Sequence, residues 1–127
     1  MTTTSFQVLV VEDNSDFLQI LCEMLETLGH RPHGVSNAED AVARLGTQPF
    51  DVLIADVQLP GMSGIDLAKI VARKAPEVRI VFSSGFGYLL TDKLDFDFVV
   101  LHKPYFLNQL KHAVEHNDSE RRTVRQQ

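Results

Sequence analysis

Two kinds of hydrophobic pattern alternate along the chain. Near-continuous apolar runs are typical of strands covered on both faces, and stretches with an apolar residue at every third or fourth position are typical of amphipathic helices. The runs predict five strands, at Phe6–Val11, Arg31–Val35, Asp51–Ala55, Val78–Ser83 and Phe98–Leu101. Because strands that alternate with helices pair in parallel through right-handed crossovers, we expect an α/β fold with a doubly wound, five-stranded parallel sheet and helices on both faces.

The helical stretches have recognisable ends. The first is expected to end at Gly29, a residue type favoured just after a helix. The second is expected to begin at Ser36, with Glu39 completing a capping box, and to stop at Gly46, and the third to span Ile65–Ala75. The positions expected to face the core in the first, second and last helices are Phe17, Leu21, Leu25 and Leu28; Ala38, Ala41, Val42 and Leu45; and Phe106, Leu107, Leu110 and Val114.

The stretch between the fourth and fifth strands, Gly85–Asp97, is the least regular. It has two glycines near its start and three aspartates, and only eighteen residues separate Ser84 from Lys103. We therefore expect the fourth helix of the fold to be short, shifted or mobile. Aromatic residues concentrate in this region. Phe82 and Phe98 are expected in the core, whereas a core position and a partner surface both stay open for Tyr88, Leu89, Leu90 and Tyr105.

Length and composition limit the classes of protein to consider. The 127 residues suffice for one domain with a hydrophobic core, expected over residues 1–116, with a polar tail or linker at residues 117–127. The net charge of −5 disfavours nucleic-acid binding, which needs clustered basic residues. The single cysteine, Cys22, excludes an internal disulfide and is expected to be a buried, inert thiol. Without a signal peptide or an apolar run of about 18 residues, we expect a cytoplasmic protein that does not bind membranes.

Polar side chains follow four of the predicted strands. In open α/β sheets, ligands bind beyond the carboxyl ends of the strands, so side chains at these ends share one crevice. Those expected there are Glu12, Asp13, Asp56, Ser83, Ser84 and Lys103. Three neighbouring carboxylates repel one another unless a cation lies between them, and Mg²⁺ prefers such oxygen ligands. The pattern therefore predicts a magnesium site.

The lysine and the serine hydroxyls point to a second ligand. With a metal ion, they would neutralise a phosphoryl group, whose charge is spread over several oxygens. A carboxylate can accept such a group as an aspartyl phosphate, and Asp56, central and followed by a turn, is the best candidate. Each motif alone has an ordinary explanation, such as a helix N-terminus for Glu12-Asp13 or a turn for Ser83-Ser84-Gly85. Only their joint placement indicates a phosphoacceptor site.

With these residues, the sequence resembles the response-regulator receiver domain of two-component signalling over Phe6–His116. The matching stretches are VLVVEDN at residues 8–14, DVQLPGMSG at 56–64, VFSSG at 81–85 and HKP at 102–104. The resemblance implies a flavodoxin-like sheet of strand order 2-1-3-4-5 and a signalling switch rather than an enzyme. The partners it implies are a histidine kinase or histidine phosphotransfer protein and a downstream protein that the sequence does not name. A homodimer stays open.

The resemblance also implies a role for each residue of the site. Asp56 would accept the phosphoryl group, Lys103 would pair with it, and Ser84, rather than Ser83, would donate a hydrogen bond to it because a glycine directly follows Ser84. Gly64 would shape the loop after Asp56. The ligands of Mg²⁺ would be Glu12, Asp13, Asp56 and the backbone carbonyl of Gln58.

One position departs from the family pattern. Val100 stands three residues before the lysine, where many receiver domains carry Tyr or Phe, so the usual aromatic switch is absent or moved to a neighbour such as Phe98. The Lys103–Pro104 bond is expected to be cis, as in many family members. The domain would belong either to a free-standing regulator or to a hybrid histidine kinase, and the ending Lys-Pro-Tyr-Phe with Val100 favours the second or a phosphorelay member.

Three other functions compete with this one. A phosphatase with an aspartyl nucleophile needs a second acid two residues later, where the chain has Gln58. A flavin or nucleotide carrier needs free backbone N–H groups in its first loop, where Glu12 and Asp13 would instead repel a phosphate. A receiver domain that binds partners without being phosphorylated is the remaining alternative.

Overall fold

A five-stranded parallel sheet, in the order β2-β1-β3-β4-β5, forms the centre of the computed structural model, which describes residues 4–85 and 94–116. The predicted α/β fold and strand order are therefore confirmed. The strands are β1 (Gln7–Val11), β2 (Arg31–Val35), β3 (Val52–Asp56), β4 (Arg79–Ser84) and β5 (Val99–His102). Each lies within one or two residues of its predicted position.

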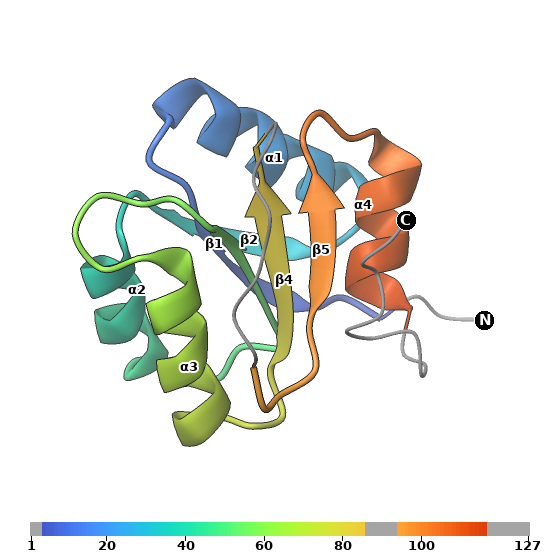
Figure 1. The fold of residues 1–127 in the computed structure, drawn as a ribbon. Coiled ribbons are helices and arrows are strands. Elements are labelled where there is room, and N and C mark those ends of the chain that lie inside the picture. The colour runs from blue at the N-terminus through green and yellow to red at the C-terminus, as the bar shows by residue number, and fades with distance from the viewer. Residues whose placement is uncertain (1–3, 86–93, 117–127) are drawn as a thin grey trace.

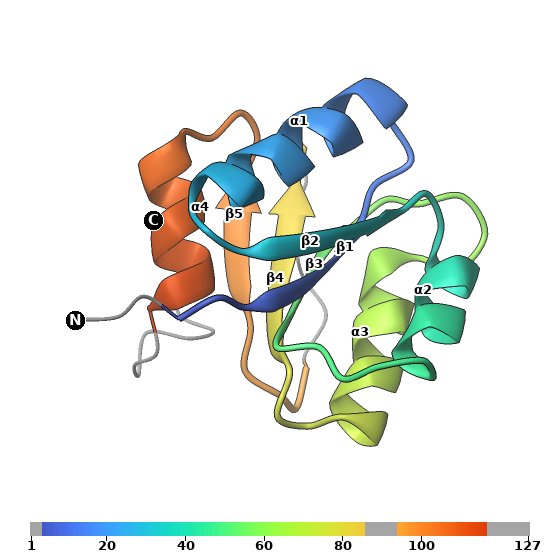
Figure 2. The same cartoon turned by 180° about the vertical axis from the view of Figure 1, so that it is seen from behind.

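Helices cover both faces of the sheet. The described residues form four helices: α1 (Ser15–Thr27), α2 (Ala38–Leu45), α3 (Gly64–Lys74) and α4 (Leu107–Glu115). Figures 1 and 2 show α1 and α4 on one face and α2 and α3 on the other. The helix expected between β4 and β5 falls mainly on residues 86–93, which lie outside the described residues, as do Tyr88, Leu89, Leu90 and the tail at 117–127. None of the described helices is long and apolar enough to cross a membrane.

The alternation of side chains along the central strand β3 explains why its sequence is apolar throughout. Val52 and Ile54 point into the core beneath α1 and α4, whereas Leu53 and Ala55 point into the core beneath α2 and α3. All five residues of β3 are buried, including Asp56 at its end. A strand covered on both faces thus carries a carboxylate to the edge of the sheet.

Capping differs from prediction in one helix. Helix α1 is followed by Gly29 in the left-handed region (φ 92°), as expected. Helix α2, however, has Asn37 as its N-cap, with the side-chain oxygen accepting the Asp40 N–H at 2.7 Å, so the predicted Ser36–Glu39 capping box is wrong. Asn37 lies one residue nearer to the helix than Ser36, and its side-chain oxygen caps the N–H of Asp40. Glu39 therefore does not take part in capping.

The last helix departs from its predicted apolar stripe. Leu110 and Val114 are buried as expected, but Phe106 is 76% exposed and Leu107 is 38% exposed, so the inward orientation predicted for these two is wrong. Phe106 is the N-cap of α4 and has an extended backbone (φ −97°, ψ 169°), so its side chain does not continue the helical stripe. The preceding residue, Tyr105, is buried instead, which settles its open assignment in favour of the core.

The remaining core assignments are largely confirmed. Phe82 is fully buried, and the partly buried ring of Phe98 packs against it at 5.5 Å between centroids. Cys22 is only half-buried against the core of α1 and β2, contrary to the fully buried position expected. Burial, helped by the charges of Glu26 and Glu23, raises the pKa of its thiol, which disfavours the reactive thiolate. That Cys22 is inert stays a prediction.

Candidate functional site

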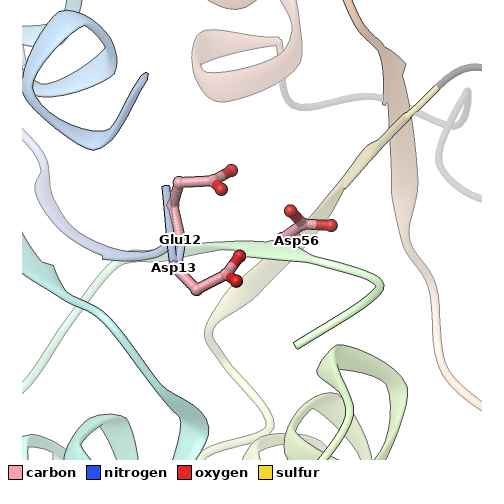
Figure 3. Close-up of side chains that lie close together, drawn as sticks. All are labelled: Glu12, Asp13 and Asp56. Atoms are coloured by element: carbon pink, nitrogen blue, oxygen red, sulfur yellow. The ribbon is translucent and has the colours of Figure 1, made fainter. Parts of the chain in front are cut away.

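Three carboxylates meet at the carboxyl edge of the sheet. Glu12 and Asp13 directly follow β1, and Asp56 ends β3, with one oxygen of each residue within 4.8 Å of the others. Figure 3 shows the carboxylates of Glu12 and Asp13 directed toward Asp56. Glu12 and Asp56 are buried, with 2% and 9% of their surface exposed, and Asp13 is exposed. The acidic cluster predicted from the strand ends therefore forms, and it is open to solvent on the side of Asp13.

Backbone N–H groups orient two of these carboxylates. Glu12 Oε2 accepts the N–H of Asn14 at 3.0 Å, and Asp56 Oδ1 accepts the N–H of Gln58 at 3.0 Å. Burial raises the pKa of Glu12, and the charge of Asp56 adds to the increase, while hydrogen bonds from Asn14 and Lys103 oppose it. The folded domain thus keeps Glu12 in a place where its negative charge is costly unless a cation is near.

Lys103 supplies such a cation. Its Nζ lies 2.9 Å from Glu12 Oε1 and 3.1 Å from Asp56 Oδ2, so the ammonium bridges the two buried carboxylates. Burial by itself would lower the pKa of Lys103, but the hydrogen bonds to Glu12 and Asp56 and their charges outweigh burial, and the net effect is a raised pKa. The ammonium therefore stays charged throughout the physiological range.

Strand β4 and the segment after β5 hold this lysine in place. The backbone N–H of Lys103 donates to the carbonyl oxygen of Ser84 at 2.7 Å, and the following Lys103–Pro104 bond is cis, as predicted. Phe17, in the first turn of α1, places its ring 4.8 Å from Lys103 Nζ. From the sequence, Phe17 was predicted only as a core residue, because nothing in the spacing relates it to a lysine so far along the chain.

The two serines at the end of β4 have different hydroxyl partners. Ser83 Oγ lies 3.2 Å from the hydroxyl of Tyr105, and both groups are buried. Ser84 Oγ donates to the carbonyl of the next residue, Gly85, at 3.3 Å, a long and local hydrogen bond. The hydroxyl of Ser84 thus has the weaker hydrogen bond of the two, and its role in binding a phosphoryl group stays a prediction.

Close backbone packing shapes the loop between β3 and α3. The N–H of Gly64 donates to the carbonyl of Val57 at 3.0 Å, and a Cβ at Gly64 would lie 2.0 Å from the carbonyl oxygen of Asp56. Glu39 of α2 also contacts this loop, because its Oε2 accepts the N–H of Met62 at 3.3 Å. The sequence did not predict this contact, because Glu39 stands at the position of a capping-box residue. The carbonyl of Gln58 stays a predicted metal ligand.

The aromatic residue proposed to replace the one missing at Val100 packs elsewhere. Phe98 makes edge contacts with Phe82 and Phe96, at 5.5 and 6.3 Å between centroids, in the core beside α3. The ring of Phe17 lies 4.8 Å from the ammonium of Lys103, and Tyr105 packs edge-on against that ring. A switching role for Phe98 stays a prediction.

Comparison with known families agrees with this geometry. A family model described as the response regulator receiver domain matches residues 8–115, which is most of the chain. The protein belongs to this family. As a receiver domain of two-component signalling, it is a signalling module rather than an enzyme, and receiver domains pair with histidine kinases.

Relatives of this receiver domain differ greatly in length. The chain is 33% identical over 112 residues to the response regulator receiver protein CpdR of Brucella abortus, and the match covers 86% of the chain and 93% of that relative. It is 34% identical over 93 residues to the virulence sensor protein BvgS of Bordetella pertussis, covering 72% of the chain but 8% of that protein. Receiver domains of this kind therefore occur both nearly alone and as small parts of large sensor proteins.

A solved structure supports the same assignment. The receiver domain (CheY-like) from Methylobacillus flagellatus is 32% identical and superimposes with a TM-score of 0.75, covering 85% of this chain and 94% of that one. The fold and the family thus agree with the acidic cluster as the candidate phosphoacceptor site.

Proposed function

We propose that Asp56 accepts a phosphoryl group from a phosphohistidine on a histidine kinase or phosphotransfer protein, and that the phosphorylated domain is read by a downstream protein. The observation that carries this proposal is the cluster of three carboxylates within 4.8 Å, with the ammonium of Lys103 bridging the two buried ones. If Lys103 only formed a structural ion pair, one carboxylate would be enough. Three carboxylates and a lysine at the open edge of the sheet suit a ligand that carries both a metal ion and an anion.

The donor set fits Mg²⁺. Glu12, Asp13 and Asp56 offer hard oxygen ligands from two sides, and the exposed position of Asp13 leaves room for water in the coordination shell. We expect these three carboxylates and the backbone carbonyl of Gln58 to hold the ion. When bound, Mg²⁺ would neutralise negative charge on the phosphoryl oxygens.

The residues of the chain can then be assigned to the transfer. A carboxylate oxygen of Asp56 forms a bond to phosphorus while the bond between phosphorus and the donor imidazole breaks, and the imidazole keeps the electron pair. Lys103, already hydrogen bonded to Asp56 Oδ2, pairs with a phosphoryl oxygen, and Ser84 turns its hydroxyl from Gly85 toward another. Both movements change contacts of β4 and of the segment after β5.

Exposed apolar side chains lie on the elements that flank this edge. Among the described residues, the large hydrophobic side chains that are exposed are Ile20 of α1, and Phe106 and Leu107 at the start of α4. Phe106 follows Lys103 by three residues, and α1 begins two residues after Asp13. Because exposed aromatic and aliphatic groups are favoured at protein interfaces, we infer that a phosphotransfer partner docks here.

Phosphorylation of Asp56 is expected on incubation with Mg²⁺ and acetyl phosphate, a small phosphoryl donor. Intact-mass spectrometry should show one added phosphoryl group on the wild type and none on Asp56→Ala. Asp51→Asn is a matched control, because Asp51 directly precedes β3, at the end of the strand away from Asp56, and its carboxylate accepts the N–H of Gln7. It should be phosphorylated like the wild type. A folded wild type that gains no mass from acetyl phosphate would contradict the proposal and favour a phosphorylation-independent binding module.

The two serines should differ in how they respond to a phosphoryl mimic. With Mg²⁺ and beryllium trifluoride, the wild type is expected to show NMR shifts that extend from Asp56 through Gly85 and into residues 94–98, because Ser84 is drawn toward the ligand. Ser84→Ala should confine the shifts to the neighbours of Asp56, whereas Ser83→Ala, which removes a hydroxyl paired with Tyr105, should keep the extended shifts. Shifts that stay local in the wild type would refute this propagation.

A further inference from the structure

Lys103 has a third partner besides the two carboxylates. Its Nζ lies 4.8 Å from the centroid of the Phe17 ring, within the range of a cation–π interaction. The ring comes from the first turn of α1, whose N-cap Asn14 accepts the N–H of Phe17 at 2.9 Å. The same Asn14 donates its own N–H to Glu12. The backbone that places the carboxylate partner of Lys103 therefore also places the ring.

A second aromatic residue fixes the Phe17 ring. Tyr105 packs edge-on against it, with 5.9 Å between centroids and an interplanar angle of 76°. Tyr105 is buried and its hydroxyl is hydrogen bonded to Ser83 at the end of β4. Contacts thus run without interruption from the ammonium of Lys103 through Phe17 and Tyr105 to Ser83.

We propose that Phe17 is a positioning residue that holds the Lys103 ammonium between Glu12 and Asp56. A lysine side chain has several rotatable bonds, and two carboxylates on one side would not by themselves stop it from swinging out to water. The face of the Phe17 ring adds a third attractive contact, which needs no proton and carries no net charge. When Asp56 takes a phosphoryl group, the ammonium can move from Asp56 Oδ2 to a phosphoryl oxygen while Glu12 and the ring keep it in place.

Phe17 gives the site an aromatic contact although Val100 occupies the position where many receiver domains carry Tyr or Phe. The aromatic contact to the site comes from α1 and from the residue after the cis proline, on the face of the sheet covered by α1 and α4. Phe98, in contrast, packs in the core beside α3. The expected effect on phosphorylation rests on the proposed function, but the position of the ammonium does not.

The first test measures the contact itself. In the unphosphorylated protein, the Cε protons of Lys103 should resonate upfield because of the Phe17 ring current. Phe17→Leu should move them toward the positions of exposed lysines, and Phe17→Tyr, which keeps the ring face, should restore them. Identical Lys103 resonances in the wild type and Phe17→Leu would overturn the proposal, whether or not Asp56 can be phosphorylated.

The second test measures the consequence for phosphoryl transfer. Phe17→Leu should slow phosphorylation by acetyl phosphate by roughly two- to fivefold, the equivalent of one cation–π contact, and Phe17→Tyr should restore the rate. Leu28→Ala controls for lost packing, because Leu28 is partly buried in the same core at the other end of α1. It should lower the urea midpoint without changing the rate. Equal slowing in Phe17→Leu and Phe17→Tyr would overturn the role, and a wild type that is never phosphorylated would refute the proposed function instead.

Discussion

Replacing Gly64 with alanine is expected to destabilise the domain by about 3 kcal/mol or more and to disrupt the phosphoacceptor site. The added Cβ would lie 2.0 Å from the carbonyl oxygen of Asp56, 2.9 Å from its carbonyl carbon and 3.1 Å from the Cα of Val57. All three are backbone atoms, so no change of rotamer can relieve the clash. Either the end of β3 or the start of α3 must move, and the hydrogen bond from Gly64 to Val57 is strained in both cases.

A second glycine provides a matched control for this prediction. At Gly46, the residue after α2, a Cβ would meet only the carbonyl of Ala43 at 3.5 Å, and the backbone is right-handed helical (φ −80°). Gly46→Ala should therefore leave stability unchanged or raise it by about 0.5 kcal/mol. Urea unfolding measures both variants, and intact mass after acetyl phosphate treatment measures the site. If the two variants have the same stability, the close approach at Gly64 is not what shapes the loop.

The arrangement at the carboxyl edge could be predicted because it follows from the parallel sheet. Once alternating apolar runs and helices indicate parallel strands, the residues that follow each run must share one edge. Glu12, Asp13, Asp56 and Lys103 meet there for that reason, and their positions in the sequence were sufficient to find them. The cis bond at Lys103–Pro104 and the loop glycine at Gly64 came from the family resemblance.

Contacts between helices and this edge could not be predicted in the same way. Phe17 was assigned to the core by its place in an apolar stripe, and the stripe does not indicate that one face of its ring meets an ammonium. Glu39 fitted a capping box, but Asn37 is one residue nearer and caps the helix instead. Phe106 fitted the stripe of the last helix, yet it precedes the first helical residue and points outward. In each case the deciding fact was a distance or a helix boundary.

Replacing Lys103 with methionine is expected to destabilise the protein by about 2 kcal/mol at neutral pH in the absence of divalent cations. The substitution leaves Glu12 and Asp56 buried together without their shared cation, and removing one partner of a buried pair is costly. This expected loss of stability allows for the partial exposure of the Lys103 side chain. Lys111→Met is the control, because its ammonium forms an exposed pair with Glu115 one helical turn away and should contribute less than about 0.5 kcal/mol.

The pH dependence of this loss should show the contribution of the buried Glu12 carboxylate. The pKa of Glu12 is already raised in the folded protein, and without the hydrogen bond from Lys103 it rises further. A carboxyl with a raised folded-state pKa binds its proton more tightly in the folded state, so the deficit of Lys103→Met is complete above that pKa and shrinks as the pH falls through it. Glu12→Gln combined with Lys103→Met should recover most of the lost stability, and Mg²⁺ should stabilise Lys103→Met more than the wild type.

The same variant separates stability from signalling. Asp56 keeps its carboxylate in Lys103→Met and should still be phosphorylated by acetyl phosphate, although more slowly than the wild type, but the NMR shifts induced by beryllium trifluoride should no longer extend beyond the site. The reason is that Lys103 joins the ligand to the segment after β5 and, through its backbone N–H, to Ser84. If the shifts extend as far in Lys103→Met as in the wild type, the ammonium only balances the charge of the two carboxylates, and the signal leaves the site through Ser84 alone.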